Sequence, residues 1–186
     1  MRTRFMAIIC AVVMLAGCKS TGKTVDKALA LRDKLLKSNG CSFYAVINAD
    51  YGEKIYTFSM DCTTDKEGNL TFTVKKPATI EGITGKISAA GGAITFDDKV
   101  LAFQTMADEQ VTPVSAPWLL IKTLRGGYLK GCTGGDDSYQ IFIDDSYEED
   151  SLQLTVNVTG DKPTSAEIFW KGRRVVTVTV ENFAYL

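Results

Sequence analysis

Histidine is absent from this chain of 186 residues. Its absence excludes the Ser-His-Asp and Cys-His catalytic schemes and every zinc site that needs histidine. A surplus of positive charge is absent as well, because 21 Lys and Arg residues are balanced by 22 Asp and Glu residues and the formal net charge is -1. Such a chain is poorly suited to neutralising phosphates, so we expect no nucleic-acid partner. We also expect no enzyme activity, no cofactor and no bound metal.

Long apolar runs are scarce, and the one near the N-terminus is too short to cross a bilayer. It covers residues 5–15 and follows Arg2 and Arg4, whereas a transmembrane helix needs about 20 residues. A basic start followed by a short apolar run is typical of a signal peptide. The sequence Leu15-Ala16-Gly17-Cys18 then resembles the bacterial lipobox, in which small residues precede a cysteine that becomes lipidated.

These features predict a bacterial lipoprotein. We expect residues 1–17 to be removed as a signal peptide and Cys18 to carry a diacylglyceryl group and a fatty acid such as palmitate. Residues 18–23 would form a short lipid-anchored tether. The membrane is therefore an expected partner, and the protein is expected on the extracellular or periplasmic side of the cell membrane.

The same region also matches the phosphate-binding P-loop pattern. Gly17, Gly22, Lys23 and Thr24 fit the spacing G-x-x-x-x-G-K-[ST]. A P-loop belongs to a parallel sheet whose strands are joined by crossovers of a dozen or more residues. Residues 41–104 instead show short strands joined by tight turns, and lipoprotein processing would cut the motif before Cys18. We therefore reject a nucleotide site.

The remaining chain shows the patterns of one mainly β domain over residues 24–186. Apolar residues at helical spacing predict helices over 24–39 and 115–125. Alternating apolar residues between turn signals predict strands over most of the rest. An antiparallel sheet of roughly ten strands must curl, and two helices on its concave side would complete an α+β half-barrel. The interior of such a fold is either a filled core or a ligand cavity.

The first hairpin allows its register to be predicted. A two-residue turn at Tyr51-Gly52 pairs residues whose numbers sum to 103, and it places the apolar side chains of both strands on one face. Cys41 then opposes Cys62 at a non-hydrogen-bonded position, where Cα atoms lie about 4.5 Å apart, which suits a disulfide. Two buried free thiols are the alternative, and Cys132 makes the count odd and allows three pairings.

Four stretches of the chain share features with a known fold family. They are the strand Gly68-Asn-Leu-Thr-Phe-Thr-Val-Lys-Lys-Pro77, the segment Gly91-Gly-Ala-Ile-Thr-Phe96, the helix Pro117-Trp-Leu-Leu-Ile-Lys-Thr-Leu124 and the hairpin Ala166-Glu-Ile-Phe-Trp170 with Arg173-Arg174. In this order they resemble the LolA-like half-barrel, the fold of bacterial carriers that escort lipoproteins or lipids across the envelope. The resemblance implies a concave apolar face that holds acyl chains. Because the soluble carriers lack a lipid anchor, a tethered binder fits this chain better than a shuttle.

Apolar side chains of the expected concave face are the candidates for lining a ligand pocket. They are Phe43, Ile47, Tyr56, Phe58, Met60, Phe72, Phe96 and Trp118. On this hypothesis the protein binds a lipid or another apolar ligand. The alternative is a non-catalytic envelope lipoprotein with a filled core that docks a protein partner, for example in sporulation or germination, as one lipidated relative of the family does.

Two further features are weighed as sites and set aside. Residues 144–150 carry five acidic side chains, but their spacing lacks the order of a calcium loop, and a solvated hairpin loop is the simpler interpretation. These acids could still repel anionic headgroups or dock a basic partner. Cys132 lies in a glycine-rich turn without histidine or another base nearby, so it is a poor candidate for a nucleophile.

Overall fold

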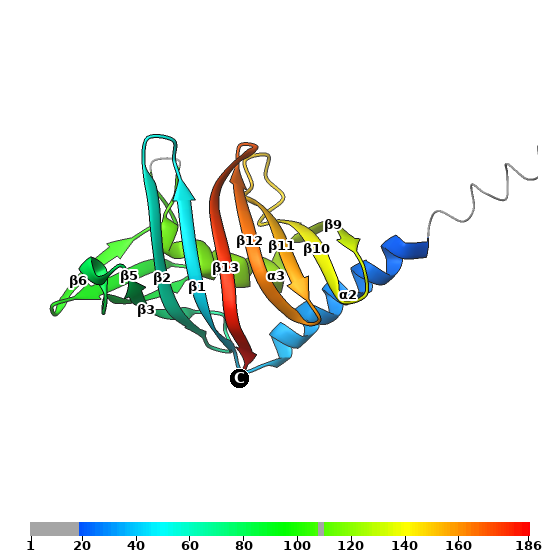
Figure 1. Cartoon of the computed structure of the whole chain (residues 1–186), viewed down its shortest axis with the longest axis horizontal. Helices are drawn as coiled ribbons and strands as arrows, with labels where there is room; N and C mark the ends of the chain where they lie inside the picture. The colour runs from blue at the N-terminus through cyan, green and yellow to red at the C-terminus, as the bar shows by residue number, and fades with distance from the viewer. Residues whose placement is uncertain (1–18, 108–109) are drawn as a thin grey trace, which may run out of the picture.

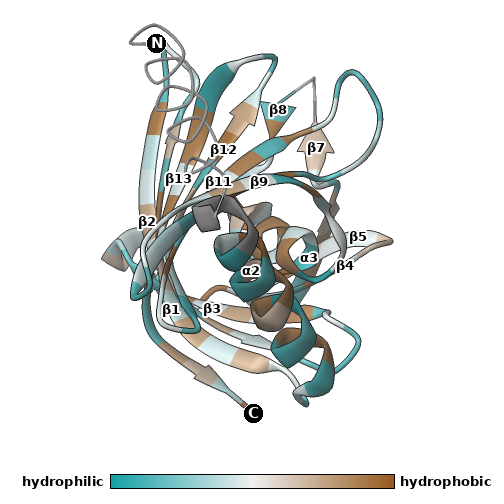
Figure 2. Cartoon of the chain, turned by 90° about the vertical axis from the view of Figure 1, so that its right-hand side faces the viewer, coloured by the Kyte–Doolittle hydropathy of each residue, from teal (hydrophilic) through white to brown (hydrophobic). Residues whose placement is uncertain are grey.

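The structure, a computed structural model, describes residues 19–107 and 110–186. Its main element is a single antiparallel sheet of 11 strands, accompanied by two α-helices and a separate two-stranded sheet. Figure 2 shows both helices inside the curl of the large sheet. The expected mainly β half-barrel with helices on its concave side is therefore confirmed.

The elements follow one another along the chain with short connections. The helices are α2 (Lys19–Lys37) and α3 (Ala116–Gly126), with two 3-10 turns, η1 (Ala78–Ile80) and η2 (Pro113–Ser115). The strands are β1 (Cys41–Asp50), β2 (Ile55–Thr64), β3 (Leu70–Lys76), β4 (Thr84–Ser88), β5 (Gly91–Phe96), β6 (Lys99–Phe103), β7 (Met106–Ala107), β8 (Gln110–Val111), β9 (Tyr128–Gly134), β10 (Ser138–Asp144), β11 (Gln153–Thr159), β12 (Lys162–Trp170) and β13 (Arg173–Tyr185). None of the helices in the described part of the chain is long and apolar enough to cross a membrane.

The large sheet consists of two meanders that meet at its centre. Its strand order is β6-β5-β4-β3-β2-β1-β13-β12-β11-β10-β9, so the first and last strands of the chain pair with each other (Figure 1). All other neighbours are consecutive in the sequence. The β1–β6 meander therefore forms one wing of the half-barrel, and the β9–β13 meander forms the other.

The helices fill one wing of the half-barrel more completely than the other. Helix α3 is apolar on nearly every side and packs on β10, β11 and β13, while α2 packs on β9 and α3. Under these helices the sheet contributes large buried side chains such as Ile141, Leu154 and Ile168. The β1–β6 wing receives less cover from the helices, and this asymmetry leaves space on its concave face.

Helix α2 begins earlier than the sequence pattern predicts. It starts at Lys19 rather than at Thr24, so residues 19–23, expected to lie in the lipid-anchored tether, are helical. Ala28, Leu31 and Leu35 form its buried stripe, as expected, whereas Leu29 and Leu36 are about half exposed. Residues 1–17 and Cys18, on which the lipoprotein prediction rests, lie outside the described residues.

The predicted register of the first hairpin is wrong by two residues. The observed pairs sum to 105, with Asp50 opposite Ile55 and Phe43 opposite Cys62, and residues 51–54 form the loop. Because the shift is even, the same residues still face inward, and alternate residues of β1 are buried as predicted. Within this loop, the backbone N–H of Tyr51 donates to the carbonyl of Lys54 at 3.0 Å.

The corrected register removes the argument for a disulfide. Cys41, Cys62 and Cys132 are all buried free thiols. The Cys41 sulfur lies 3.2 Å from the Thr64 hydroxyl, and the Cys41 backbone N–H donates to the same oxygen at 2.9 Å. The structure therefore supports the alternative of buried thiols, because Cys62 is opposite a phenylalanine and not opposite Cys41.

Candidate functional site

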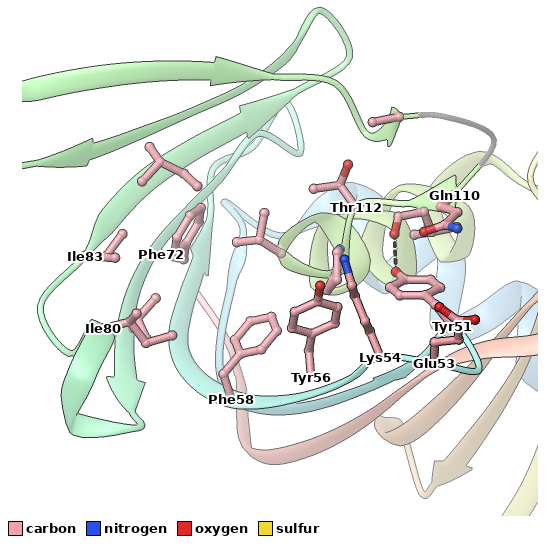
Figure 3. Close-up of a pocket in the computed structure, with 16 residues that line it drawn as sticks. Tyr51, Glu53, Lys54, Tyr56, Phe58, Phe72, Ile80, Ile83, Gln110 and Thr112 are labelled. Carbon is pink, nitrogen blue, oxygen red and sulfur yellow. Dashed lines mark hydrogen bonds between the residues drawn. The ribbon is translucent and has the colours of Figure 1, made fainter.

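A cavity of about 900 Å³ opens on the concave face of the β1–β6 wing (Figure 3). Its volume falls within the range of about 300–1,000 Å³ that is typical of small-molecule sites. Its walls come from the β1–β2 hairpin, β3, the β3–β4 connection, β5 and the segment that contains β7, β8 and η2. The lining residues are Tyr51, Glu53, Lys54, Tyr56, Phe58, Phe72, Val74, Ile80, Ile83, Ile94, Ala107, Gln110, Val111, Thr112, Pro113 and Val114.

One end of the cavity is entirely apolar. Phe58, Phe72 and Val74 come from β2 and β3, and Ile94 comes from β5. A glycine makes room for the largest of these side chains: a Cβ at Gly85 would lie only 2.4 Å from the ring of Phe72. The absence of a side chain at Gly85 therefore leaves room for the Phe72 ring, which lines the cavity.

The connection between β3 and β4 completes the apolar end. It folds back on β3, because the N–H of Val74 donates to the carbonyl of Ile83 at 2.8 Å and the N–H of Gly82 donates to the carbonyl of Val74 at 3.0 Å. This places Ile80 and Ile83, both half-buried, against the cavity. The sequence pattern predicts a continuous strand over 79–87, but the structure has η1 and a turn before β4 begins at Thr84.

The opposite end of the cavity is polar. Tyr51, Glu53 and Lys54 come from the β1–β2 loop, and Gln110 and Thr112 come from the segment that crosses the mouth. The hydroxyl of Tyr51 donates a hydrogen bond to the carbonyl of Val111, which ties the loop to that segment (Figure 3). Burial, and to a smaller extent the neighbouring Tyr56, raises the pKa of Tyr51 to about 12.

The segment that crosses the mouth is held at both of its ends. Met106 of β7 pairs with Val111 of β8. Beyond β8, the backbone N–H of Thr112 donates to the carbonyl of Thr105 at 2.9 Å, and its hydroxyl donates to the carbonyl of Gln104 at 2.6 Å. These bonds fix the position of Val111 as the acceptor for Tyr51.

Three of the eight predicted lining residues meet at this cavity, namely Tyr56, Phe58 and Phe72. Four others are buried elsewhere in the core, with exposed fractions of 4% for Phe43, 0% for Ile47 and Met60, and 5% for Trp118. Phe96 is 51% exposed in the β5–β6 hairpin, outside the cavity. The prediction identified the correct strands and face but did not separate the filled part of that face from the open part.

Two of the buried residues pack in the core and do not line the cavity as predicted. Phe43 stacks on Phe183 of β13, with ring centroids 5.9 Å apart. The indole N–H of Trp118 donates to the carbonyl of Gly68 at 3.1 Å, which fixes α3 on the β2–β3 turn. Both side chains are parts of the core, because neither borders the cavity.

Residues from outside the predicted strands make up most of the remaining lining. Tyr51 and Lys54 lie in the longer loop that the register error concealed, and the residues from 110 to 114 precede the second helix. Two further lining residues, Ile80 and Ile83, lie inside the stretch 79–87 that the sequence pattern predicts to be a strand. Which side of the fold that stretch covers depends on tertiary hydrogen bonds.

The other features weighed from the sequence have structural roles. Asp144 pairs with Lys130 at 3.0 Å, and Asp145 accepts the backbone N–H of Leu152 at 2.8 Å. Burial raises the pKa of Cys132, which disfavours the reactive thiolate. Among the residues that the structure describes, no group of three or more His, Cys, Asp or Glu side chains could hold a metal ion.

Comparison with solved structures finds the same architecture in bacterial proteins. A LolA superfamily protein from Nitrosomonas europaea matches 84% of this chain and 92% of its own, with 9% identity and a TM-score of 0.47. A domain from Vibrio parahaemolyticus, named for outer-membrane lipoprotein sorting, matches 88% of this chain and 92% of its own, with 8% identity and a TM-score of 0.51. The chain has a LolA-like fold.

A third match is lipoprotein LppX from Mycobacterium tuberculosis, in which 87% of this chain and 93% of that chain are covered at 12% identity, with a TM-score of 0.40. Neither a protein-family model nor a curated protein sequence matches the chain. At these identities the likeness concerns the fold alone. In this LolA-like half-barrel the cavity therefore has to be interpreted from the chain's own residues.

Proposed function

We propose that the protein is a membrane-anchored envelope lipoprotein that binds a lipid or another apolar ligand in its half-barrel cavity. The observation that supports this proposal is the cavity itself, with a volume of about 900 Å³ and a continuous apolar end. Burying an acyl chain there is worth roughly 0.8 kcal/mol for each CH₂ before ordering costs. The name of the similar Vibrio parahaemolyticus domain, which refers to lipoprotein sorting, points in the same direction.

The anchor belongs to the proposal on sequence evidence. The lipobox-like Leu15-Ala16-Gly17-Cys18 follows a short apolar run, and helix α2 begins at Lys19. A lipid on Cys18 would therefore hold the domain close to the membrane surface. Replacing Cys18 with Ser is expected to abolish metabolic labelling with palmitate, and continued labelling of the variant would contradict the anchor.

We propose a binding role rather than a catalytic one for the same cavity. The ionisable side chains that line it are Tyr51, Glu53, Lys54 and Tyr56. The hydroxyl of Tyr51 is engaged by the Val111 carbonyl, and its raised pKa of about 12 keeps the phenol protonated near neutral pH. A group in that state does not act as a general base.

Filling the cavity tests the proposal without placing a charge in the core. Ile83 is half-buried at the apolar end, so Ile83→Trp should occupy part of the space and weaken the binding of an uncharged apolar dye such as N-phenyl-1-naphthylamine. The matched control is Ile55→Trp on the β1–β2 hairpin, where the side chain is 71% exposed and does not border the cavity. Dye fluorescence, titrated with each variant, measures the effect.

We expect at least a tenfold loss of dye affinity in Ile83→Trp and little change in Ile55→Trp, because a loss of about 1.4 kcal/mol is tenfold. Thermal unfolding of both variants separates lost binding from lost folding. Equal binding by wild type and both variants would place the dye elsewhere and contradict the proposal.

The docking of an envelope protein partner is the second candidate, and one surface feature favours it. In the edge strand β6, Val100 and Leu101 are 69% and 68% exposed, and Phe96 at the end of the neighbouring β5 is 51% exposed. An exposed apolar edge strand suits the addition of a partner's β-strand. If wild type binds neither the dye nor any lipid, this candidate takes first place, and Leu101→Lys becomes the variant to examine in a pull-down from envelope extracts.

A further inference from the structure

The cavity is amphipathic along its length. Six apolar side chains form one end, whereas a loop with two charged residues, Glu53 and Lys54, forms the other. In Figure 3 the Lys54 amine and the Tyr56 hydroxyl point into the cavity from the β1–β2 hairpin. A purely apolar ligand would leave both polar groups without a partner when it excluded water from the cavity, at a cost in free energy. The chemistry of the polar end therefore carries information about the ligand.

The Lys54 ammonium is available for a ligand. Within residues 19–107 and 110–186 it makes no ion pair and no side-chain hydrogen bond. The Tyr56 hydroxyl is equally without a hydrogen-bond partner among these residues, and the Tyr56 side chain is 44% exposed. Two donors thus point into the same space, and neither has a hydrogen-bond partner among the described residues.

The loop that carries Lys54 is fixed before any ligand arrives. Its ends are closed by the Tyr51 N–H to Lys54 carbonyl bond of 3.0 Å. A carboxylate oxygen of Asp50 accepts the Gly52 N–H at 2.8 Å and pairs with Arg173 at 3.3 Å. The Tyr51 hydroxyl ties the loop to Val111. Binding a head group therefore requires little ordering of the backbone, which lowers its cost.

We infer that the cavity takes a single-chain amphiphile with an anionic head, a carboxylate or a phosphate, which lies against Lys54 and Tyr56 while the tail lies along Ile80, Ile83 and Ile94. This inference rests on the proposed function and adds the ligand class to it. Hydrogen bonds to a charged acceptor are stronger than bonds between neutral groups. The anionic head would thus satisfy both donors at the polar end.

Among residues 19–107 and 110–186, Glu53 is the one acidic side chain that lines the cavity, and it opposes an anionic head. Figure 3 shows it beside Tyr51, to the side of the space into which Lys54 points. Its carboxylate would instead attract a cationic head. The two neighbouring side chains therefore make opposite predictions about the head group, and this allows a direct test.

The test compares four ligands that share one twelve-carbon tail: dodecanoate, dodecyl phosphate, dodecanol and dodecylamine. Each displaces N-phenyl-1-naphthylamine from the wild-type protein at pH 7.5, below its micellar concentration. We expect dodecanoate and dodecyl phosphate to bind more tightly than dodecanol, by about fivefold to tenfold, and dodecylamine to bind most weakly. Comparison of the dodecanoate and dodecyl phosphate affinities shows which of the two head groups the polar end prefers.

Variants of Lys54 and Glu53 test whether these residues cause the preference for an anionic head group. Lys54→Gln is expected to remove most of the ratio between dodecanoate and dodecanol affinities, whereas Lys99→Gln, an exposed lysine outside the cavity, keeps that ratio. Glu53→Gln should increase the ratio between dodecanoate and dodecanol affinities, because it removes the negative charge that opposes an anionic head. Thermal unfolding confirms that each variant is folded, which is expected because all three side chains are exposed.

The outcomes separate this inference from the proposed function. Equal affinity for all four ligands, with no effect of Lys54→Gln, would overturn the anionic head group but would still support the binding of an apolar ligand in the cavity. Tightest binding of dodecylamine, lost in Glu53→Gln, would overturn it in favour of a cationic head. If no ligand displaces the dye and the dye itself does not bind, the proposed function fails and the inference fails with it.

Discussion

At the scale of single residues, tyrosine hydroxyls hold together parts of the chain that are distant in sequence. Tyr51 reaches from the first hairpin to Val111, Tyr139 bonds to the carbonyl of Lys27 at 3.5 Å, and Tyr185 donates to the carbonyl of Asp161. Burial raises the pKa of all three phenols. Each of these hydrogen bonds needs the hydroxyl proton. Because burial raises the pKa, the phenol keeps this proton at pH values well above neutral.

These tyrosines predict a loss of stability in alkaline solution. The pKa of Tyr51 and that of Tyr139 rise from 10.0 to about 12 in the folded protein. Their contribution is therefore fully present below pH 10 and is lost as the pH rises from 10 through 12, because the unfolded state releases the protons first. We expect the urea midpoint to be nearly constant from pH 8 to 9.5 and to fall steeply above pH 10.

The control for alkaline unfolding is a variant that lacks one of the buried phenols. Tyr51→Phe should be less stable than wild type at pH 8, by about 1 kcal/mol, because the Val111 carbonyl loses its donor. It should also lose less stability than wild type between pH 10 and 12. A Tyr51→Phe profile parallel to that of wild type would show that this phenol does not contribute.

At the scale of elements, two arginines attach the helices to one another and to the sheet. The Arg32 guanidinium donates to the carbonyl of Leu124 at 2.9 Å and to that of Gly127 at 2.7 Å. Arg125 donates to the carbonyl of Leu35 at 2.9 Å and to that of Lys66 at 2.7 Å. The last carbonyls of a helix have no partner within the helix, and the arginines donate to them. The Leu35 carbonyl also accepts the Ser38 hydroxyl at 3.0 Å. The arginine bonds join the two helices to each other and attach α3 to the turn between β2 and β3.

Removal of one such arginine should destabilise the fold more than removal of a surface ion pair. Arg125→Met keeps an apolar side chain but removes the side-chain donor of the Lys66 carbonyl and one of the two side-chain donors of the Leu35 carbonyl. We expect a loss of about 1.5–3 kcal/mol for these two bonds from a charged group. Arg174→Met, which removes an exposed pair with Glu167, should cost less than about 1 kcal/mol. Urea unfolding of both variants measures the difference, and equal losses would contradict this account of how the helices are attached.

At the scale of the whole molecule, the spacing of apolar residues, every second residue in strands and about every 3.6 residues in helices, was sufficient to predict the half-barrel. The inward face of β1 and the buried stripe of α2 followed directly from alternation and helical spacing. The cavity did not follow, because apolar residues that fill a core and those that line a space have the same pattern. Phe43 and Phe58 lie on the same face of one hairpin, yet Phe43 is buried against β13 whereas Phe58 borders the opening. The difference arises from where the helices lie over the sheet.

The hairpin error has a similar origin. A four-residue loop and a two-residue loop give the same inward residues, because a shift of two leaves the faces unchanged. Hydrogen bonds made by Asp50 and Tyr51 select the longer loop, and one of them is to Val111, about 60 residues away along the chain. Rules that relate turn type to the local sequence take no account of a hydrogen-bond partner so distant along the chain. The longer loop is also what brings Lys54 to the cavity.

The central claim is that the concave cavity holds an apolar chain, and the dependence of affinity on chain length tests it most directly. Dissociation constants of uncharged alcohols from octanol to hexadecanol are measured by dye displacement from the wild-type protein. We expect each added CH₂ to tighten binding by up to about fourfold, which corresponds to 0.8 kcal/mol, until the tail fills the roughly 900 Å³ cavity and affinity levels off. In Ile83→Trp that plateau should begin at a shorter chain. Affinity that is immeasurable, or that is independent of chain length, would contradict the account.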